Sequence, residues 1–198
     1  MVSLFKRWFA RLGRALIGRR GSQPCQATSV PGAASQKGIA MCENDKTQRC
    51  FETVVAHLAH HGFRFGRADG DPLLFLPVSG RNGTYACVVN VADAILRVYS
   101  VIGCHAPEEK RGTMVELLNR VNWHLVIGNF ELDAADGEIR FRTALDARGG
   151  ELTDEMVECT IRANLATVDR YHPAIMTLLW NDLSAEDALA LVEGNSAE

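Results

Sequence analysis

The chain has 198 residues, of which 47% are hydrophobic and 23% are charged, a composition typical of a globular protein. The formal net charge is −3, but the charges are unevenly distributed: seven of the 21 Lys and Arg residues precede Glu43, the first acidic residue, and the other 14 share the rest of the chain with all 24 Asp and Glu. The acidic body excludes nucleic acid as the main ligand, because phosphate contacts require clustered basic side chains.

Residues 1–20 are predicted to form a basic amphipathic helix. On a helical wheel, its apolar side chains fall within an arc of roughly 140°, and the basic side chains lie opposite. Such a helix can lie on a membrane surface or contact a partner, with its rings at the headgroup boundary and its arginines near anionic lipid. The segment lacks the continuous run of about 20 apolar residues that a helix needs to span a bilayer. The predicted contact residues are Leu4, Phe5, Trp8, Phe9, Leu12 and Leu16 on the apolar side and Lys6, Arg7, Arg11 and Arg14 on the basic side.

Two alternatives stay open for this N-terminal segment. It could be a tail helix docked on the folded domain or on a partner. It could also be a cleaved organellar transit peptide, since the acid-free first 42 residues are rich in Arg, Ser and Ala.

Residues 21–45 contain many Gly, Ser and Pro residues without periodicity, which predicts a flexible linker.

Residues 46–194 are predicted to form one folded domain, whose elements alternate between helical and strand periodicity. Its first half is expected to contain a helix at 46–61, a short strand at 73–78 and a hairpin of strands at 85–91 and 95–102. The next helix begins at Pro107, and a second hairpin follows at 129–133 and 138–146.

The C-terminal part of the domain is predicted to be helical. Thr153 is a good N-cap for a long helix, and Pro173 is expected to interrupt that helix. Ser184 caps a final helix that ends at Gly194. The resulting order is α-β-β-β-α-β-β-α with an extra helix at the C-terminus. Antiparallel hairpins separated by helices predict an α+β domain rather than a parallel sheet.

The second half of the domain carries short segments that resemble the YbjN family of bacteria. The similar segments are Leu117–Asn122, Gly128–Asp133, Asp136–Ile139, Gly149–Thr153 and Asp169–Tyr171. The resemblance extends over residues 47–192 and implies a sensory transduction regulator with the type III secretion chaperone fold. Chaperones of that fold dimerise and hold extended client segments, so the resemblance implies a protein partner and a homodimer. The motifs that carry the resemblance are turns, caps and strands, and they indicate no active site.

Histidines near the end of the first predicted helix form the first candidate for chemistry. His57 and His61 are four residues apart, so one helix face would present both to a metal ion. Leu58 stands where a catalytic zinc helix would carry glutamate, and the sequence offers no third ligand. We therefore expect these histidines to flank the buried stripe near solvent, with no metal bound.

Other polar clusters are expected to be structural. Cys104-His105 lacks the third group that orients a catalytic base. Asp133, Asp136 and Glu138 lie at a hairpin turn without the spacing of a calcium loop. Asn82 begins an N-glycosylation pattern that matters only in a secreted protein. The six cysteines form no C-x-x-C pair, which favours a reduced, cytoplasmic chain.

The sequence therefore predicts a non-enzymatic protein-binding module, chaperone-like or regulatory, without catalytic residues, cofactor or metal. It is expected in the cytoplasm, at the inner face of the membrane if the N-terminal helix attaches there. The alternative is an organellar protein, or a metal-binding protein or enzyme that uses His57, His61 or a cysteine.

Overall fold

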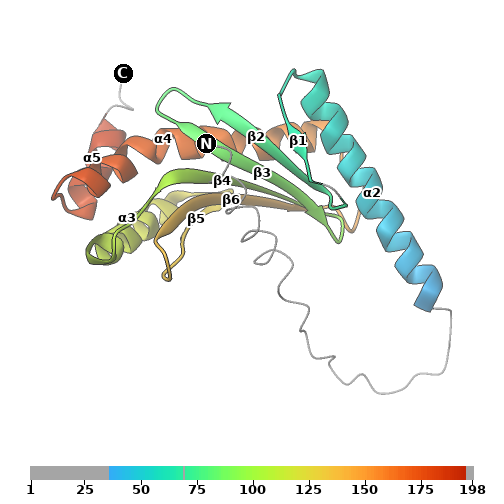
Figure 1. Ribbon diagram of the computed structural model, residues 1–198, viewed down its shortest axis with the longest axis horizontal. Helices are drawn as coiled ribbons and strands as arrows, with labels where there is room; N and C mark the ends of the chain where they lie inside the picture. The colour runs from blue at the N-terminus through green and yellow to red at the C-terminus, as the bar shows by residue number, and fades with distance from the viewer. Residues whose placement is uncertain (1–35, 69, 195–198) are drawn as a thin grey trace, which may run out of the picture. The chain divides into compact units, whose positions relative to one another are not determined.

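The computed structural model describes residues 36–68 and 70–194, and they form the α+β domain predicted from the sequence (Figure 1). The predicted order of elements is confirmed, with one short additional strand. The elements are α2 (Gln36–His60), β1 (Gly66–Arg67), β2 (Leu73–Ser79), β3 (Thr84–Ala92), β4 (Ile95–His105), the 3-10 helix η1 (Glu108–Lys110), α3 (Arg111–His124), β5 (Asn129–Leu132), β6 (Glu138–Asp146), α4 (Asp154–Trp180) and α5 (Ala185–Glu193).

The strands form one antiparallel sheet in the order β1-β2-β3-β4-β6-β5. In the hairpin of β3 and β4, Ala92 pairs with Ile95, so only two residues form the turn. These are Asp93 and Ala94, with φ of 54° and 53°. Positive φ at both positions matches the twist of the adjoining strands and makes this a tight turn. The predicted strands, 85–91 and 95–102, leave three residues between them, and the structure adds Ala92 to β3.

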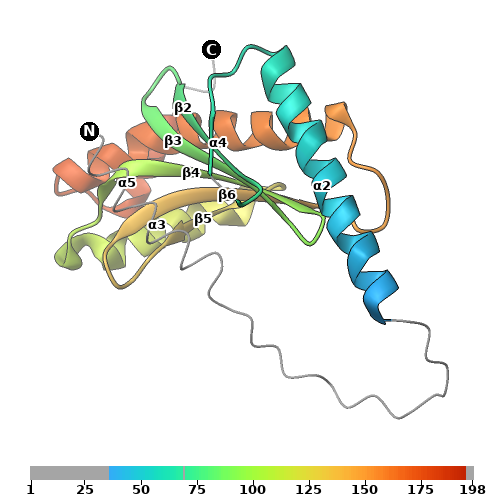
Figure 2. The same cartoon turned by 45° about the vertical axis from the view of Figure 1, so that its right-hand side comes forward.

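Helix α4 runs across one face of the sheet in both views, with α2 near one of its ends and α5 near the other (Figures 1 and 2). Alternation along β6 places Ile139, Phe141 and Thr143 in the interior, because every second residue of a strand faces the same side of the sheet. Two apolar clusters result: α2, β2–β4 and the first turns of α4 enclose one, and α3, α5, the β5–β6 hairpin and the rest of α4 enclose the other.

The first helix begins earlier than predicted. Helix α2 starts at Gln36, ten residues before the expected start, so residues 36–45 of the predicted linker are helical. Their sequence lacks apolar periodicity, which is why the segment was assigned to a linker, but Ala, Met, Glu and Lys are good helix formers. Once packing of Phe51, Val54 and Leu58 has fixed the helix, extending it over such residues costs little free energy.

The long helix also continues through the proline expected to interrupt it. Pro173 lies inside α4, which ends only at Trp180. Proline has no N–H to offer the carbonyl four residues earlier, here that of Asp169. The Asn82 side chain donates to that oxygen at 2.9 Å instead, from the turn between β2 and β3. A tertiary hydrogen bond therefore satisfies the carbonyl that the proline leaves without its helical donor.

Candidate partner-binding face

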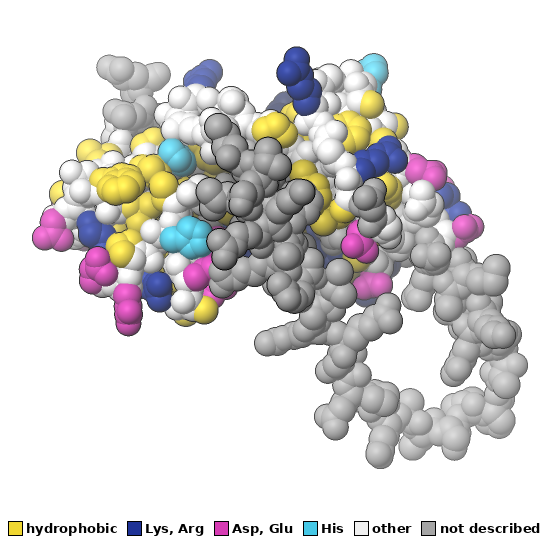
Figure 3. Space-filling model, viewed as in Figure 1, with side chains coloured by type: hydrophobic (Ala, Val, Ile, Leu, Met, Phe, Trp, Pro, Cys, Tyr) yellow, Lys and Arg dark blue, Asp and Glu magenta, His cyan; other side chains and the backbone are white. Residues whose placement is uncertain are grey.

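Three exposed apolar side chains fall within five residues at the end of α3, and we call this group the α3 apolar patch. Trp123 is 84% exposed, Val126 97% and Ile127 52%. The inward stripe of α3 ends at Val121, and a residue two positions later lies about 200° further around the helix, on its outer side. Figure 3 shows hydrophobic side chains gathered over the region of α3 and α5. Exposed apolar side chains that lie together mark interaction surfaces.

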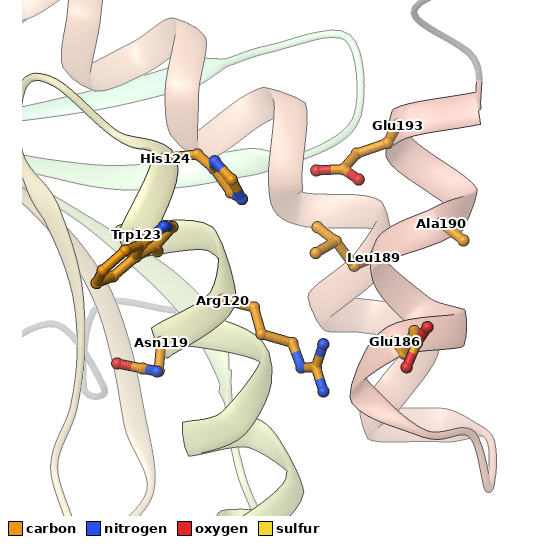
Figure 4. Close-up of a pocket in the computed structure, with 8 residues that line it drawn as sticks. All are labelled: Asn119, Arg120, Trp123, His124, Glu186, Leu189, Ala190 and Glu193. Atoms are coloured by element: carbon orange, nitrogen blue, oxygen red, sulfur yellow. The ribbon is translucent and has the colours of Figure 1, made fainter.

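A groove of about 480 Å³ lies beside this patch, between α3 and α5 (Figure 4). Trp123 belongs to both the patch and the groove. Helix α3 forms one wall and α5 the other, and the bases of the walls pack into the core through Val121 and Leu189. The lining residues are Asn119, Arg120, Trp123, His124, Glu186, Leu189, Ala190 and Glu193.

The charge of this α3–α5 groove is set by its carboxylates. Arg120 donates to Glu116 on its own helix at 2.8 Å. This hydrogen bond, together with attraction to Glu116 and Glu186, raises the pKa of Arg120 above its already high value. Arg120 interacts with both Glu116 and Glu186, but Glu186 and Glu193 outnumber the single arginine of the lining and give the α5 wall an acidic character. The groove thus suits a ligand that is apolar on one side and basic on another.

The sheet edge beside the patch is capped by a side chain. Strand β5 is an edge strand, and the backbone of Phe130 is bonded to the amide of Asn122. The Phe130 N–H donates to Asn122 Oδ1 at 2.7 Å, and Asn122 Nδ2 donates to the Phe130 carbonyl at 3.1 Å. These are the groups through which an edge strand would recruit another strand. Addition of a partner strand at Phe130 would therefore have to displace Asn122.

The structure brings the predicted histidine pair to a carboxylate that the sequence did not indicate. His57 Nδ1 lies 2.8 Å from Asp154 Oδ1, at the first residue of α4. The His57 and His61 rings have centroids 4.4 Å apart. The expectation that these histidines lie near solvent is correct for His61 but wrong for His57. The His57 side chain is buried where α2 meets the start of α4.

The other polar clusters have local partners. His105 Nδ1 lies 3.1 Å from the Asp136 carbonyl, so the histidine contacts the β5–β6 turn. Asp133 accepts the Ala135 N–H at 2.8 Å, and Asp136 accepts the Glu138 N–H at 3.1 Å, which is how Asp stabilises its own turn. These contacts agree with the structural role expected for the acidic cluster.

The predicted N-terminal contacts, Leu4 to Leu16 on the apolar side and Lys6 to Arg14 on the basic side, lie outside the described residues. None of the described helices is both long and apolar enough to cross a membrane.

Cys50, Cys87, Cys104 and Cys159 are free thiols. Burial raises the pKa of Cys87 to about 12, against a smaller lowering by its hydrogen bond to Ser100, so this thiol is not an activated nucleophile.

A family model described as "Putative bacterial sensory transduction regulator", that of YbjN, matches residues 51–176. The chain belongs to the YbjN family. The resemblance carried by the turns and caps of the second half is thereby confirmed. No curated protein matches the chain.

Two solved structures resemble this YbjN-family chain. YbjN from E. coli is 15% identical with a TM-score of 0.49, and the match covers 74% of this chain and 91% of that one. A chain of the ExsC–ExsE complex is 14% identical with a TM-score of 0.50, covering 69% of this chain and 98% of that one. The second likeness supports the predicted type III secretion chaperone-like fold, and at this identity it concerns the fold alone.

In this YbjN-family chain, the groove and the role of Asn122 were not predicted from the sequence. Trp123 was detectable as the large apolar residue outside the stripe of α3. The α5 wall was not, because no local pattern states which helix lies beside α3. Asn122 lay within a segment similar to the family, but its bonds to Phe130 depend on how the chain turns after α3.

Proposed function

We propose that this YbjN-family chain is a non-enzymatic binding protein, chaperone-like or regulatory, that takes an amphipathic helical segment of a partner protein into the α3–α5 groove. The observation that carries the proposal is the α3 apolar patch at the rim of that groove, with Trp123 84% and Val126 97% exposed. Large aromatic side chains at the rim of a groove are common anchors in protein interfaces.

The geometry favours a helix over an extended strand as the occupant. Asn122 already occupies the hydrogen-bonding groups of Phe130 on the β5 edge, so strand addition there would cost two existing bonds. A groove between two helices instead accepts the apolar face of a third helix. Glu186 and Glu193 on α5 would meet basic residues flanking that face.

The comparisons support a partner-binding role at a general level. The family is described as regulatory, and a chain of similar fold was crystallised in a complex that contains two different proteins, ExsC and ExsE. The groove is a feature of this chain's own structure, and the helical form of the partner segment is our proposal.

Two tryptophans provide a matched test. Full-length wild type, Trp123→Glu and Trp180→Glu are used to capture partners from cells, and binding of each identified partner is then measured with purified proteins. Trp180 is also exposed, at 72%, but it lies at the end of α4 and does not line the groove. We expect Trp123→Glu to weaken binding at least about 30-fold, as loss of an interface anchor does, and Trp180→Glu to retain it. Equal binding by all three proteins would contradict the proposal.

We further propose the organisation predicted from the sequence: a membrane-attached basic helix at residues 1–20, a linker that now ends where α2 begins, and the YbjN-like domain at the inner face of the membrane. The linker of Gly, Ser and Pro residues and the segregated basic charge support this arrangement. A bacterial family favours membrane attachment over organellar import. A second copy of the chain is the other candidate partner, and the molar mass in solution distinguishes monomer from homodimer.

A further inference from the structure

We propose that His57, His61 and Asp154 form a binding site for a divalent transition-metal ion, with Zn²⁺ as the best match. One ligand atom from each of the three side chains can be chosen so that all three lie within 4.8 Å of one another. The site is separate from the α3–α5 groove, because its residues belong to the end of α2 and the beginning of α4.

The donor atoms suit such an ion. Two imidazole nitrogens and a carboxylate oxygen are common zinc ligands, at metal–ligand distances of about 2.0–2.2 Å. Tetrahedral geometry with those distances separates neighbouring ligand atoms by roughly 3.3 Å. His57 Nδ1 and Asp154 Oδ1 are already 2.8 Å apart, so a shift of about half an ångström would admit a metal between them.

The three side chains differ in exposure in a way that favours capture of an ion. The His57 side chain is only 3% exposed and is held in place by packing. The Asp154 side chain is 55% exposed, and His61 is also exposed, so both can rotate to close on the metal. The same exposure lets water fill the fourth position, as in zinc sites with three protein ligands.

The backbone arrangement explains why the ligands converge. His57 and His61 are one helical turn apart near the end of α2, which places both rings on one face. Asp154 is at the first turn of α4, immediately after the N-cap Thr153. A bound metal would therefore tie the end of α2 to the start of α4 and stabilise their contact.

The test uses the full-length protein and metal ions alone. Zn²⁺ binding is measured by calorimetry for wild type, His61→Ala and Asp154→Asn, with His60→Ala as the control. His60 is an exposed neighbour on the same helix and lies outside the cluster. We expect wild type and His60→Ala to bind one Zn²⁺ with equal affinity, and the other two variants to bind at least 10-fold more weakly, as loss of a metal ligand implies.

Two further measurements separate ligand loss from other causes. Melting temperatures without metal should be similar for wild type and His61→Ala, because His61 is exposed, and Zn²⁺ should raise the melting temperature only where it binds. The absorption spectrum of the Co²⁺-loaded protein should show nitrogen and oxygen coordination without a thiolate charge-transfer band. Undetectable Zn²⁺ binding by wild type, retained affinity in both ligand variants, loss in His60→Ala, or a dominant thiolate band would overturn the proposal.

Discussion

Asp169 shows how one side chain joins two distant parts of the chain. Its carboxylate accepts the Arg81 N–H at 3.0 Å, the Asn82 N–H at 2.9 Å and the Tyr85 hydroxyl at 2.7 Å. Burial by itself would raise the pKa of this carboxyl, but the hydrogen bonds, that of the Asn82 N–H foremost, outweigh burial and hold it below its usual value. The ionised carboxylate thus fixes the β2–β3 turn to the middle of α4.

Replacing Tyr85 with phenylalanine tests this contact. Hydrogen bonds to charged groups contribute about 1.5–3 kcal/mol, so Tyr85→Phe should lower the free energy of unfolding by that amount at pH 7–9. Burial, followed by the hydrogen bond and repulsion from Asp169, raises the pKa of Tyr85. A raised pKa in the folded state means that the contribution is complete below the unfolded value of about 10 and is lost at higher pH.

Urea unfolding of wild type and Tyr85→Phe between pH 7 and pH 11 measures this difference. The difference in free energy of unfolding between wild type and Tyr85→Phe should stay constant up to pH 9. It should shrink above about pH 10, where the tyrosine of the unfolded wild-type chain releases its proton. Tyr99→Phe serves as the control, because Tyr99 is also buried but lies on β4 away from Asp169. A difference that grows with pH would contradict the assigned role.

Asn164 is the second residue on which distant elements depend. It is completely buried in α4 and joins that helix to the sheet. Its Nδ2 donates to the Val98 carbonyl at 3.0 Å and to Thr143 Oγ1 at 3.2 Å, and its Oδ1 accepts from Ser100 at 2.6 Å. The network satisfies several polar groups at once, so its loss should be costly.

Asn164→Ala should therefore lower the free energy of unfolding by about 2–4 kcal/mol, since it leaves buried polar groups without partners. Chemical denaturation measures the effect. Arg162→Ala is the matched control on the same helix, because its side chain is 82% exposed and its removal should change stability by less than about 0.5 kcal/mol. Equal effects of the two substitutions would show that the network contributes nothing specific.

At the scale of elements, the edge strand β5 depends on Asn122 in the preceding helix. Asn122→Ala should cost about 1–3 kcal/mol in unfolding free energy and expose the Phe130 backbone to strand pairing. We expect this variant to self-associate more than Asn119→Ala, which changes an exposed amide on the same helix. Light scattering over a concentration series compares the two, and identical profiles would remove the proposed protective role.

The boundaries of two helices were also decided between elements. Pro173 and its neighbours predict a break, and the break is absent because Asn82 donates to the carbonyl that the proline leaves without a partner. The extension of α2 to Gln36 likewise depends on packing against other elements, since a helix held by its buried stripe can propagate over good helix formers. Local rules therefore failed where a remote donor or a remote surface changed the balance.

At the scale of the whole molecule, the N-terminal segment should determine where the domain resides. Deleting residues 1–20 should move the protein from the membrane fraction to the supernatant of fractionated cells, because it removes both the apolar face and the basic charges. A deletion of equal length within the linker, 21–35, should leave it with the membranes. If the full-length protein is found entirely in the supernatant, the segment does not attach the domain to a membrane. An intact Met1 or Val2 in N-terminal sequencing would exclude a cleaved transit peptide.

Local sequence patterns were sufficient to predict the order of elements, the caps at Thr153 and Ser184 and the membership of the YbjN family. These features depend on residues close together in the chain, where spacing and capping chemistry act directly. Contacts between separate elements account for three other features: Asp154 reaches His57, Asn122 caps β5, and α5 forms a groove with α3. The first pair is separated by 97 residues, and such meetings are set by packing of the whole core rather than by any local pattern.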